Sequence, residues 1–188
     1  MSLDITSSQA SPKSSSGLSK PTIALHWAVA ISFLVVICIG VYMVDMPRGP
    51  EKGEMIGLHK SLGVLVLALA SIRVAWRFKE GKIKSVAKLD AVKQKAADAV
   101  HGLLLLATIA MPLSGAIMSV AGGRSLDFFG LELIAAGDKN ESLQSIAHTF
   151  HVNAPYLIYA ILVLHLAAAI KHHFIDKDAT LKRMLGKG

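Results

Sequence analysis

The sequence predicts an all-α integral membrane protein, a four-helix bundle with both chain termini in the cytoplasm. Hydrophobic residues make up 53% of the 188 residues and charged residues only 18%, whereas a soluble domain carries about 25% charged residues. The charged residues are missing from four long stretches rather than spread evenly. The Lys and Arg residues between these stretches favour one side, as they do on the cytoplasmic side of membrane proteins.

The N-terminal part divides into a polar tail and the first helix. Residues 1–20 are rich in Ser and poor in large apolar side chains, so we expect a disordered cytoplasmic tail. The next 24 residues, 21–44, contain no Asp, Glu, Lys or Arg, and about 20 such residues suffice for a membrane-spanning helix. Pro21 suits the first turn of that helix. Cys38 is the only cysteine, which excludes an internal disulfide, and we expect it to be a small buried apolar residue.

The second stretch is the least clear of the four. Only 12 uncharged residues lie between Lys60 and Arg73, a length that also fits a buried helix of a soluble protein. Long basic side chains near helix ends can nevertheless reach the membrane interface. We therefore expect a spanning helix at residues 56–78, with Trp76 at a membrane boundary.

Two further apolar stretches complete the bundle. We expect the third and fourth helices at residues 99–121 and 149–174, and Pro112 and Gly115 predict a kink in the third. The membrane domain would then cover residues 21–176, and residues 177–188 would form a second cytoplasmic tail.

The basic residues set the expected orientation. Of the 20 Lys and Arg residues, 15 lie in the N-terminal tail, in residues 73–98 and after Ile170, whereas the loops at 45–60 and 124–147 hold the other 5. Basic loops stay in the cytoplasm, so both termini should be cytoplasmic. This requires an even number of helices and supports the second one. The net charge of +7 is thus explained by membrane topology, and no nucleic-acid partner is expected.

Interior histidines are the strongest functional signal, because an ionisable side chain inside a membrane is costly. The expected helix directions place His26, His101 and His165 near the cytoplasmic side, and His59 and His151 near the outer side. Each level has one histidine on the fourth helix and a partner on another helix. Low-spin haem b takes one imidazole on each face of its iron, so the pattern predicts two haem b groups. The eight histidines of the chain are His26, His59, His101, His148, His151, His165, His172 and His173.

Helical spacing refines this prediction. His151 and His165 are 14 residues apart, which places them within about 40° on one helix face and about 21 Å apart along the axis. His148 lies about 100° away from that face, so we expect His151 to be the ligand and His148 to be an interfacial residue. His59 and Arg73 share the 14-residue spacing. Arg73 would either pair with a propionate of the inner haem or reach the interface as a topology anchor.

Three other histidines remain open at this point. His101 is a third candidate for the two inner axial positions, and spacing alone does not exclude it. His172 and His173 follow the last apolar stretch beside Lys171 and Asp176, where solvated interfacial residues are expected.

Sequence motifs surround these histidines on all four helices. They are Leu25-His26-Trp27 on the first, Leu58-His59 followed by Gly63 and Arg73 on the second, and His101 before Met111-Pro112 and Gly115 on the third. The fourth has Leu164-His165-Leu166-Ala167-Ala168-Ala169, then His172-His173-Phe174 and Lys177-Asp178. Over about residues 20–185 the chain resembles the bacterial cytochrome b561 family, especially its superoxide oxidase type, which is a di-haem superoxide:ubiquinone oxidoreductase.

The resemblance implies a set of haem ligands. It pairs His26 with His165 at the inner level and His59 with His151 at the outer level, and it removes His101 from the axial positions. The implied cofactors are two haem b groups.

The resemblance also implies a quinone site at the cytoplasmic face, to which His101 and His172 would contribute. Ubiquinone would be the electron acceptor. Phe150 stands where the family has Trp, and His148 is an additional histidine, so the edge of the outer haem departs from the family pattern.

The expected function is electron transfer from superoxide at the outer face to ubiquinone at the cytoplasmic side of a bacterial inner membrane. The outer loops carry 7 acidic and 5 basic residues, which disfavours steering of an anionic donor. One alternative is a haem subunit that passes electrons between quinone and a partner dehydrogenase or hydrogenase. Another is a haem-free transporter that uses histidines as proton relays. The cations that could form a local patch for superoxide are Arg48, Lys52, Lys60 and Arg124.

Overall fold

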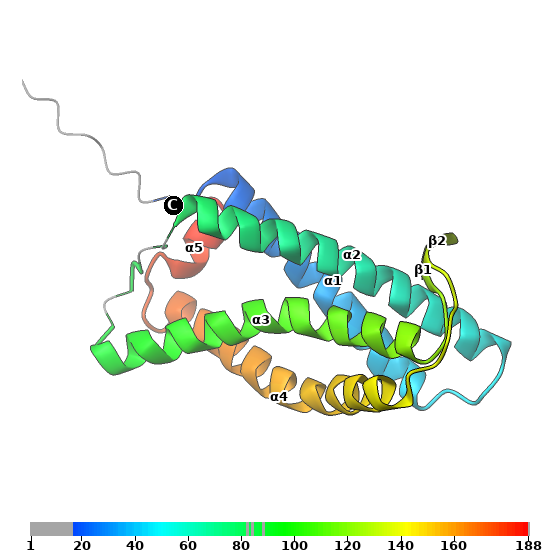
Figure 1. The fold of residues 1–188 in the computed structure, drawn as a ribbon. Helices are drawn as coiled ribbons and strands as arrows, with labels where there is room; N and C mark the ends of the chain where they lie inside the picture. The colour runs from blue at the N-terminus through cyan, green and yellow to red at the C-terminus, as the bar shows by residue number, and fades with distance from the viewer. Residues whose placement is uncertain (1–16, 82, 84, 88, 188) are drawn as a thin grey trace, which may run out of the picture.

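The computed structural model describes residues 17–81, 83, 85–87 and 89–187, which form four long helices, one short helix and one hairpin (Figure 1). Most of the expected N-terminal tail, residues 1–16, lies outside the described residues. The elements are α1 (Lys20–Val44), α2 (Pro50–Glu80), α3 (Ala91–Ala121), β1 (Leu126–Phe128), β2 (Leu131–Ile134), α4 (Glu141–Phe174) and α5 (Thr180–Met184).

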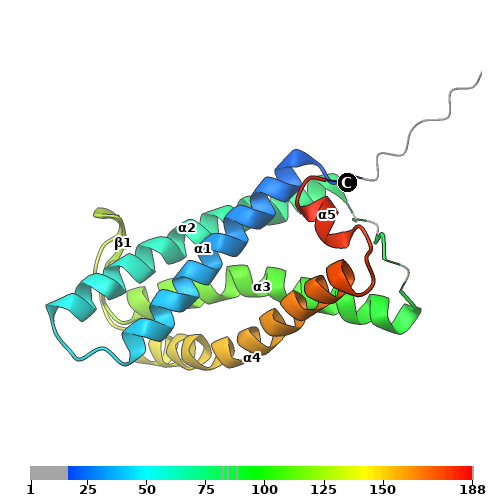
Figure 2. The same ribbon diagram turned by 180° about the vertical axis from the view of Figure 1, so that it is seen from behind.

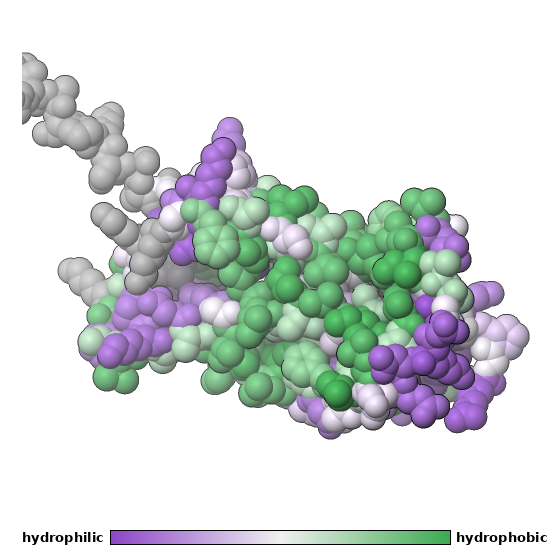
Figure 3. Space-filling view, in the orientation of Figure 1, coloured by the Kyte–Doolittle hydropathy of each residue, from purple (hydrophilic) through white to green (hydrophobic). Residues whose placement is uncertain are grey.

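The four long helices form the predicted membrane bundle. Each is long and apolar enough to cross a bilayer, including α2. Large apolar side chains such as Ile31, Ile72 and Leu106 are exposed on the outside of the bundle, as expected where the solvent is lipid. The molecular surface is accordingly apolar in the middle and polar at both ends (Figure 3). Cys38 is also exposed, contrary to the expected burial, because an apolar residue of a membrane helix can face lipid as readily as the core.

Three helices begin earlier than their apolar stretches. The expected starts were residues 56, 99 and 149, whereas α2, α3 and α4 begin at Pro50, Ala91 and Glu141. The side chains of Asp90 and Asn140 accept hydrogen bonds from backbone amides at 2.9 and 3.0 Å and cap α3 and α4. Hydropathy marks only the segment inside the bilayer, while helical hydrogen bonding continues outward to the capping residue.

Consecutive helices pack against each other, α1 on α2, α2 on α3 and α3 on α4, so the chain runs up and down through the bundle (Figures 1 and 2). The start of α1, the end of α2, the start of α3 and α5 lie together at one end, here called the inner end. The hairpin lies at the opposite, outer end, where β1 packs on α2 and α3.

An apolar layer crosses the bundle midway between the two ends. It takes one buried residue from each long helix, namely Phe33, Val66, Ala107 and Ile158. On α4, Ile158 lies seven residues from both His151 and His165. Seven residues correspond to about two helical turns, so this layer separates two levels of histidines, one toward each end.

Polar contacts attach the short elements to the bundle. The Phe129 amide donates to Ser61 Oγ at 3.0 Å, and Phe129 and Gly130 both have positive φ at the hairpin turn, as in tight two-residue turns. At the inner end, Trp27 Nε1 donates to the Met184 carbonyl at 2.7 Å and ties α5 to α1. The expected C-terminal tail therefore includes a helix that is docked on the bundle.

Candidate functional site

The outer level contains two histidine rings that face each other. His59 of α2 and His151 of α4 have ring centroids 6.2 Å apart and perpendicular planes. Glycines make room for both rings: a Cβ on Gly40 would lie 3.1 Å from His59 Cε1, and one on Gly115 would lie 2.9 Å from His151 Cε1. The His59 ring therefore packs against α1 at Gly40, and the His151 ring packs against α3 at Gly115, where no side chain occupies the space.

Hydrogen bonds orient the His151 ring. Its Nδ1 lies 2.9 Å from Ser114 Oγ and 3.1 Å from the Met111 carbonyl. Ser114 Oγ donates its own hydrogen to the Met111 carbonyl at 2.8 Å, so we infer that His151 Nδ1 carries a hydrogen and donates it. The unprotonated Nε2 is then available to a metal, and a backbone carbonyl behind the ring is typical of metal-bound histidine.

The His59 ring lacks such an orienting contact. It faces the Val36 carbonyl, but within the described part of the chain its buried Nδ1 makes no well-aligned hydrogen bond. A buried polar atom without a partner is costly. Its presence on a ring that faces another imidazole suits a site built around a bound group.

The inner level brings together three histidines and one arginine. His26 of α1 and His165 of α4 have centroids 6.5 Å apart, with their planes at 55°. His101 of α3 also meets His165, with centroids only 5.4 Å apart. Arg73 Nη2 lies 3.1 Å from His26 Nδ1. Arginine can only donate, so His26 Nδ1 accepts, and the Arg73 side chain is directed at the ring rather than away from the bundle.

Ring separations test whether an iron could lie between the imidazoles. A ligating nitrogen lies about 2 Å from a transition metal and about 1.2 Å from its ring centroid, so two axial rings have centroids about 6.4 Å apart. The separations of 6.2 Å at the outer level and 6.5 Å at the inner level match this value. The His101–His165 separation is about 1 Å too short. The two pairs therefore have the ring separation that bis-imidazole haem requires.

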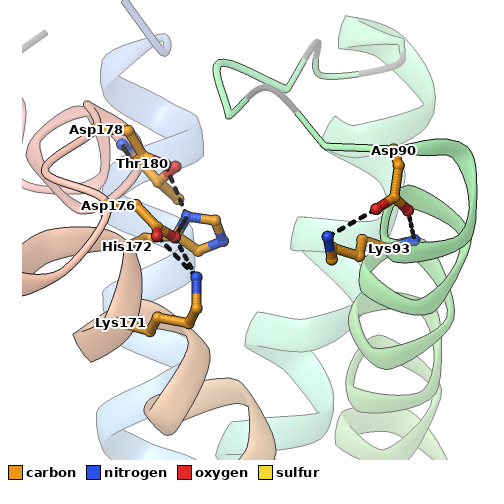
Figure 4. A network of polar contacts seen from close by, with 7 residues as sticks. All are labelled: Asp90, Lys93, Lys171, His172, Asp176, Asp178 and Thr180. Atoms are coloured by element: carbon orange, nitrogen blue, oxygen red, sulfur yellow. Dashed lines mark hydrogen bonds and ion pairs between the residues drawn. The ribbon is translucent and has the colours of Figure 1, made fainter.

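A polar network lies at the inner end, where α4 turns toward α5 (Figure 4). His172 Nδ1 lies 2.7 Å from Asp178 Oδ2, and the Thr180 amide donates to Asp178 Oδ1 at 2.8 Å. Burial alone would raise the pKa of Asp178, but the hydrogen bonds from Thr180 and His172 outweigh it and hold this pKa below its usual value. The sequence motifs included Asp178 without a role, because its contact with His172 depends on the turn after α4.

The same network brings possible metal ligands together. One ligand atom each of His172, Asp176 and Asp178 lie within 4.8 Å of one another. Lys171 Nζ, however, already lies 2.7 Å from both carboxylate oxygens of Asp176. Because this ammonium neutralises the acidic group, we assign no metal to the cluster.

Of the other expected site residues, His148 is exposed on α4. Two cations of the expected outer patch donate hydrogen bonds to backbone carbonyls. Lys52 Nζ donates to the Val44 and Met46 carbonyls at 3.2 and 2.9 Å. Lys60 Nζ donates to the Ser125 carbonyl.

Four membrane-spanning helices with opposed histidine rings at two depths define a class, the membrane cytochromes that hold haem b between helices and transfer electrons. The comparison with known proteins is more specific. A model of the family described as prokaryotic cytochrome b561 matches residues 17–187, and the chain belongs to this family. It is therefore a haem b electron-transfer protein of a bacterial membrane.

Relatives match along nearly their whole length. "Cytochrome b561 homolog 2" of Escherichia coli (strain K12) is 34% identical over 172 residues, which cover 87% of this chain and 88% of that protein. "Cytochrome b561 homolog 1" of the same organism is 27% identical, with 89% and 96% covered. "Probable superoxide oxidase CybB" of Yersinia pestis is 28% identical, with 88% and 93% covered.

Proposed function

We propose that this chain is a superoxide:quinone oxidoreductase with two haem b groups, which takes electrons at the outer face and reduces ubiquinone at the cytoplasmic side. The observation that carries the proposal is the presence of two opposed ring pairs, with centroids 6.2 and 6.5 Å apart, at levels 14 residues apart on α4. The relative named probable superoxide oxidase supports the choice of donor.

The four opposed histidines would hold the haems. His59 and His151 would bind the outer haem, and His26 and His165 the inner one. When bound, haem b supplies reversible one-electron transfer. The Nδ1 hydrogen bond of His151 to the Met111 carbonyl would fix the ring and strengthen its Nε2 as a ligand.

Arg73 would serve the inner haem. A neutral imidazole that binds metal through Nε2 keeps its hydrogen on Nδ1, so His26 could no longer accept the hydrogen bond that Arg73 now donates to it. The guanidinium would then be released toward a haem propionate, with which it can form a charge-assisted pair.

His101 and His172 would form the quinone site. His101 lies at the inner level, but its ring is too close to His165 for an iron between them. His172 lies two turns beyond His165 on α4, toward the inner end. The net reaction is two superoxide, one ubiquinone and two protons giving two dioxygen and one ubiquinol. Imidazole groups at this end would donate hydrogen bonds and protons to the quinone oxygens.

The basic residues support the direction of transfer. The inner end gathers the start of α1, the end of α2, the start of α3 and α5, and the described segments at this end supply most of the 20 Lys and Arg residues. By the positive-inside rule this end, with both termini, would face the cytoplasm across the bacterial inner membrane.

The test uses the purified protein alone. Pyridine haemochrome analysis should give two haem b per chain. A pulse of superoxide should reduce the haems, and added ubiquinone should reoxidise them. If dithionite reduces the protein and superoxide does not, the proposed donor is wrong.

The haem relay subunit is a second candidate because of the charges at the outer end. Acidic residues outnumber basic ones in the outer loops, 7 to 5, and the Lys52 and Lys60 ammoniums donate hydrogen bonds to backbone carbonyls. A partner protein that donates electrons would not need the positive surface potential that attracts an anion such as superoxide. Co-purification of a partner with flavin or iron–sulfur clusters would favour this candidate.

A further inference from the structure

The two carboxylate oxygens of Asp178 have different partners. Oδ1 accepts from the Thr180 amide at 2.8 Å, at the start of α5. Oδ2 lies 2.7 Å from His172 Nδ1. The side chain of Asp178 is partly buried, as is that of His172, with 19% and 17% of their surfaces exposed. One oxygen thus fixes the turn into α5, and the other fixes a ring of the proposed quinone site.

The short contact determines which nitrogen of His172 carries a hydrogen. The pKa of Asp178 lies below its usual value, so at neutral pH the group is a carboxylate and can only accept. The hydrogen in the contact must come from His172 Nδ1. In a neutral ring Nε2 is then unprotonated, and in a doubly protonated ring both nitrogens carry hydrogens.

Among the described residues, the charged groups drawn with His172 in Figure 4, apart from Asp178, have ionic partners of their own. Asp176 Oδ2 lies 3.3 Å from His172 Nδ1, but both oxygens of Asp176 lie 2.7 Å from Lys171 Nζ. On α3, which lies across from this network in Figure 4, Lys93 pairs with Asp90 at 2.7 Å. Asp178 is therefore the closest partner of the His172 ring.

We propose that Asp178 is a positioning residue for proton delivery to quinone, because it holds His172 with Nδ1–H toward its carboxylate and leaves Nε2 to carry the transferred proton. The inference rests on the proposed quinone site and assigns a role within it.

The proton balance follows from this arrangement. Doubly protonated His172 donates Nε2–H to a quinone oxygen. When the quinone takes up two electrons, which two superoxide molecules supply in the proposed reaction, this N–H bond breaks and an O–H bond forms. His172 becomes the neutral Nδ1–H form, and Nε2 takes a new proton from the cytoplasmic water. The second proton goes to the other quinone oxygen by a route that does not use Asp178.

Asp178→Asn separates the two roles of the side chain. The amide oxygen can still accept from Thr180, so the turn into α5 is kept. The amide NH₂ would face His172 Nδ1, which must then accept, and the hydrogen moves to Nε2. A neutral His172 ring with its hydrogen on Nε2 can donate a hydrogen bond to a quinone oxygen. Transfer of that hydrogen as a proton would, however, leave a negatively charged imidazolate.

The experiment measures quinone-dependent reoxidation in detergent-solubilised protein that holds its haems. For Asp178→Asn we expect kcat to fall roughly 100-fold, as for loss of a general acid. KM for ubiquinone, haem content and reduction by superoxide should stay near wild type. Asp176→Asn is the matched control and should change kcat less than 2-fold, in roughly the range of a solvent-exposed contact.

Two outcomes would overturn the inference. Wild-type kcat in Asp178→Asn would do so, as would an equally large loss in Asp176→Asn. A purely structural role predicts that Asp178→Ala is impaired while Asp178→Asn is normal, because only the alanine removes the acceptor for Thr180.

A second measurement distinguishes failure of the inference from failure of the quinone site. If His172→Ala leaves reoxidation unchanged, His172 does not serve quinone and the proposed site is wrong. The His172 tautomer is independent of that result. In ¹⁵N-histidine spectra of the reduced protein, recorded with the ring neutral and assigned with His172→Gln, the hydrogen should lie on Nδ1 in wild type and on Nε2 in Asp178→Asn. The same tautomer in both would refute the role of Asp178.

Discussion

Replacement of Gly115 by alanine should weaken the outer haem site although it should strengthen the helix. Gly115 lies inside α3, where a glycine-to-alanine change normally gains about 1 kcal/mol through helix propensity. The His151 ring, however, occupies the space that the new methyl group needs. The two effects have opposite signs, and their sizes decide the result.

The structure gives the size of the clash. The added Cβ would lie 2.9 Å from His151 Cε1, whereas carbon atoms are comfortable from about 3.5 Å. A shift of about 0.6 Å would be needed, and it would strain the bonds from His151 Nδ1 to Ser114 and Met111. Overpacking costs about 1–3 kcal/mol. The expected net loss in the stability of the folded protein is therefore up to about 2 kcal/mol, and the displaced His151 ring should bind the outer haem more weakly.

Gly57→Ala is the matched control. Gly57 lies in α2, two residues before His59, and nothing lies within 4 Å of its added Cβ. It should bind haem normally and be as stable as wild type or more so. Gly40→Ala, with a contact of 3.1 Å to His59, should give an intermediate loss. The measurements are the haem-to-protein ratio and the thermal unfolding midpoint. Equal haem content and stability in Gly115→Ala and Gly57→Ala would refute the reasoning.

Four further predictions concern single side chains. His151→Ala should lose one low-spin haem, whereas exposed His148→Ala should keep both; the reverse result in visible spectra would contradict the face assignment. His101→Ala should retain two haems while reoxidation by ubiquinone slows, and loss of a haem would make His101 an axial ligand. Arg73→Gln keeps a hydrogen-bond donor but removes a positive charge, so redox titration should show the inner haem potential lower by roughly tens of mV. Ser61→Ala removes the acceptor of the hairpin amide and should cost about 1 kcal/mol of stability without changing haem content.

Much of the fold could be predicted because a bilayer imposes length and composition directly. Three helices follow from uninterrupted apolar runs, and α2 follows from the parity of the basic loops. The helix starts could not be read in the same way, because Asp90 and Asn140 cap α3 and α4 in polar sequence outside the bilayer. The predicted burial of Cys38 was also wrong, since hydropathy does not distinguish a lipid-facing residue from a core residue.

The candidate site was predictable in its levels but not in its contacts. The 14-residue spacing of His151 and His165 gives depth and face. It does not give ring separations, so spacing alone leaves His101 as a third inner candidate, whereas the structure adds its shorter distance to His165. Gly115 was expected only as part of a kink. Its role as the seat of the His151 ring depends on how α3 and α4 pack, which a single sequence does not reveal.

The seven-residue step between layers also restricts how this chain can change in length. One residue inserted between His151 and His165 would turn one level about 100° away from the other, so insertions and deletions should be confined to the connections outside the helices. The number of histidine levels that the bundle can hold is restricted as well. The two levels already span about 21 Å of a hydrocarbon core about 30 Å thick. A third level at the same spacing would fall outside the bilayer, so a longer electron path would require a second protein rather than a taller bundle.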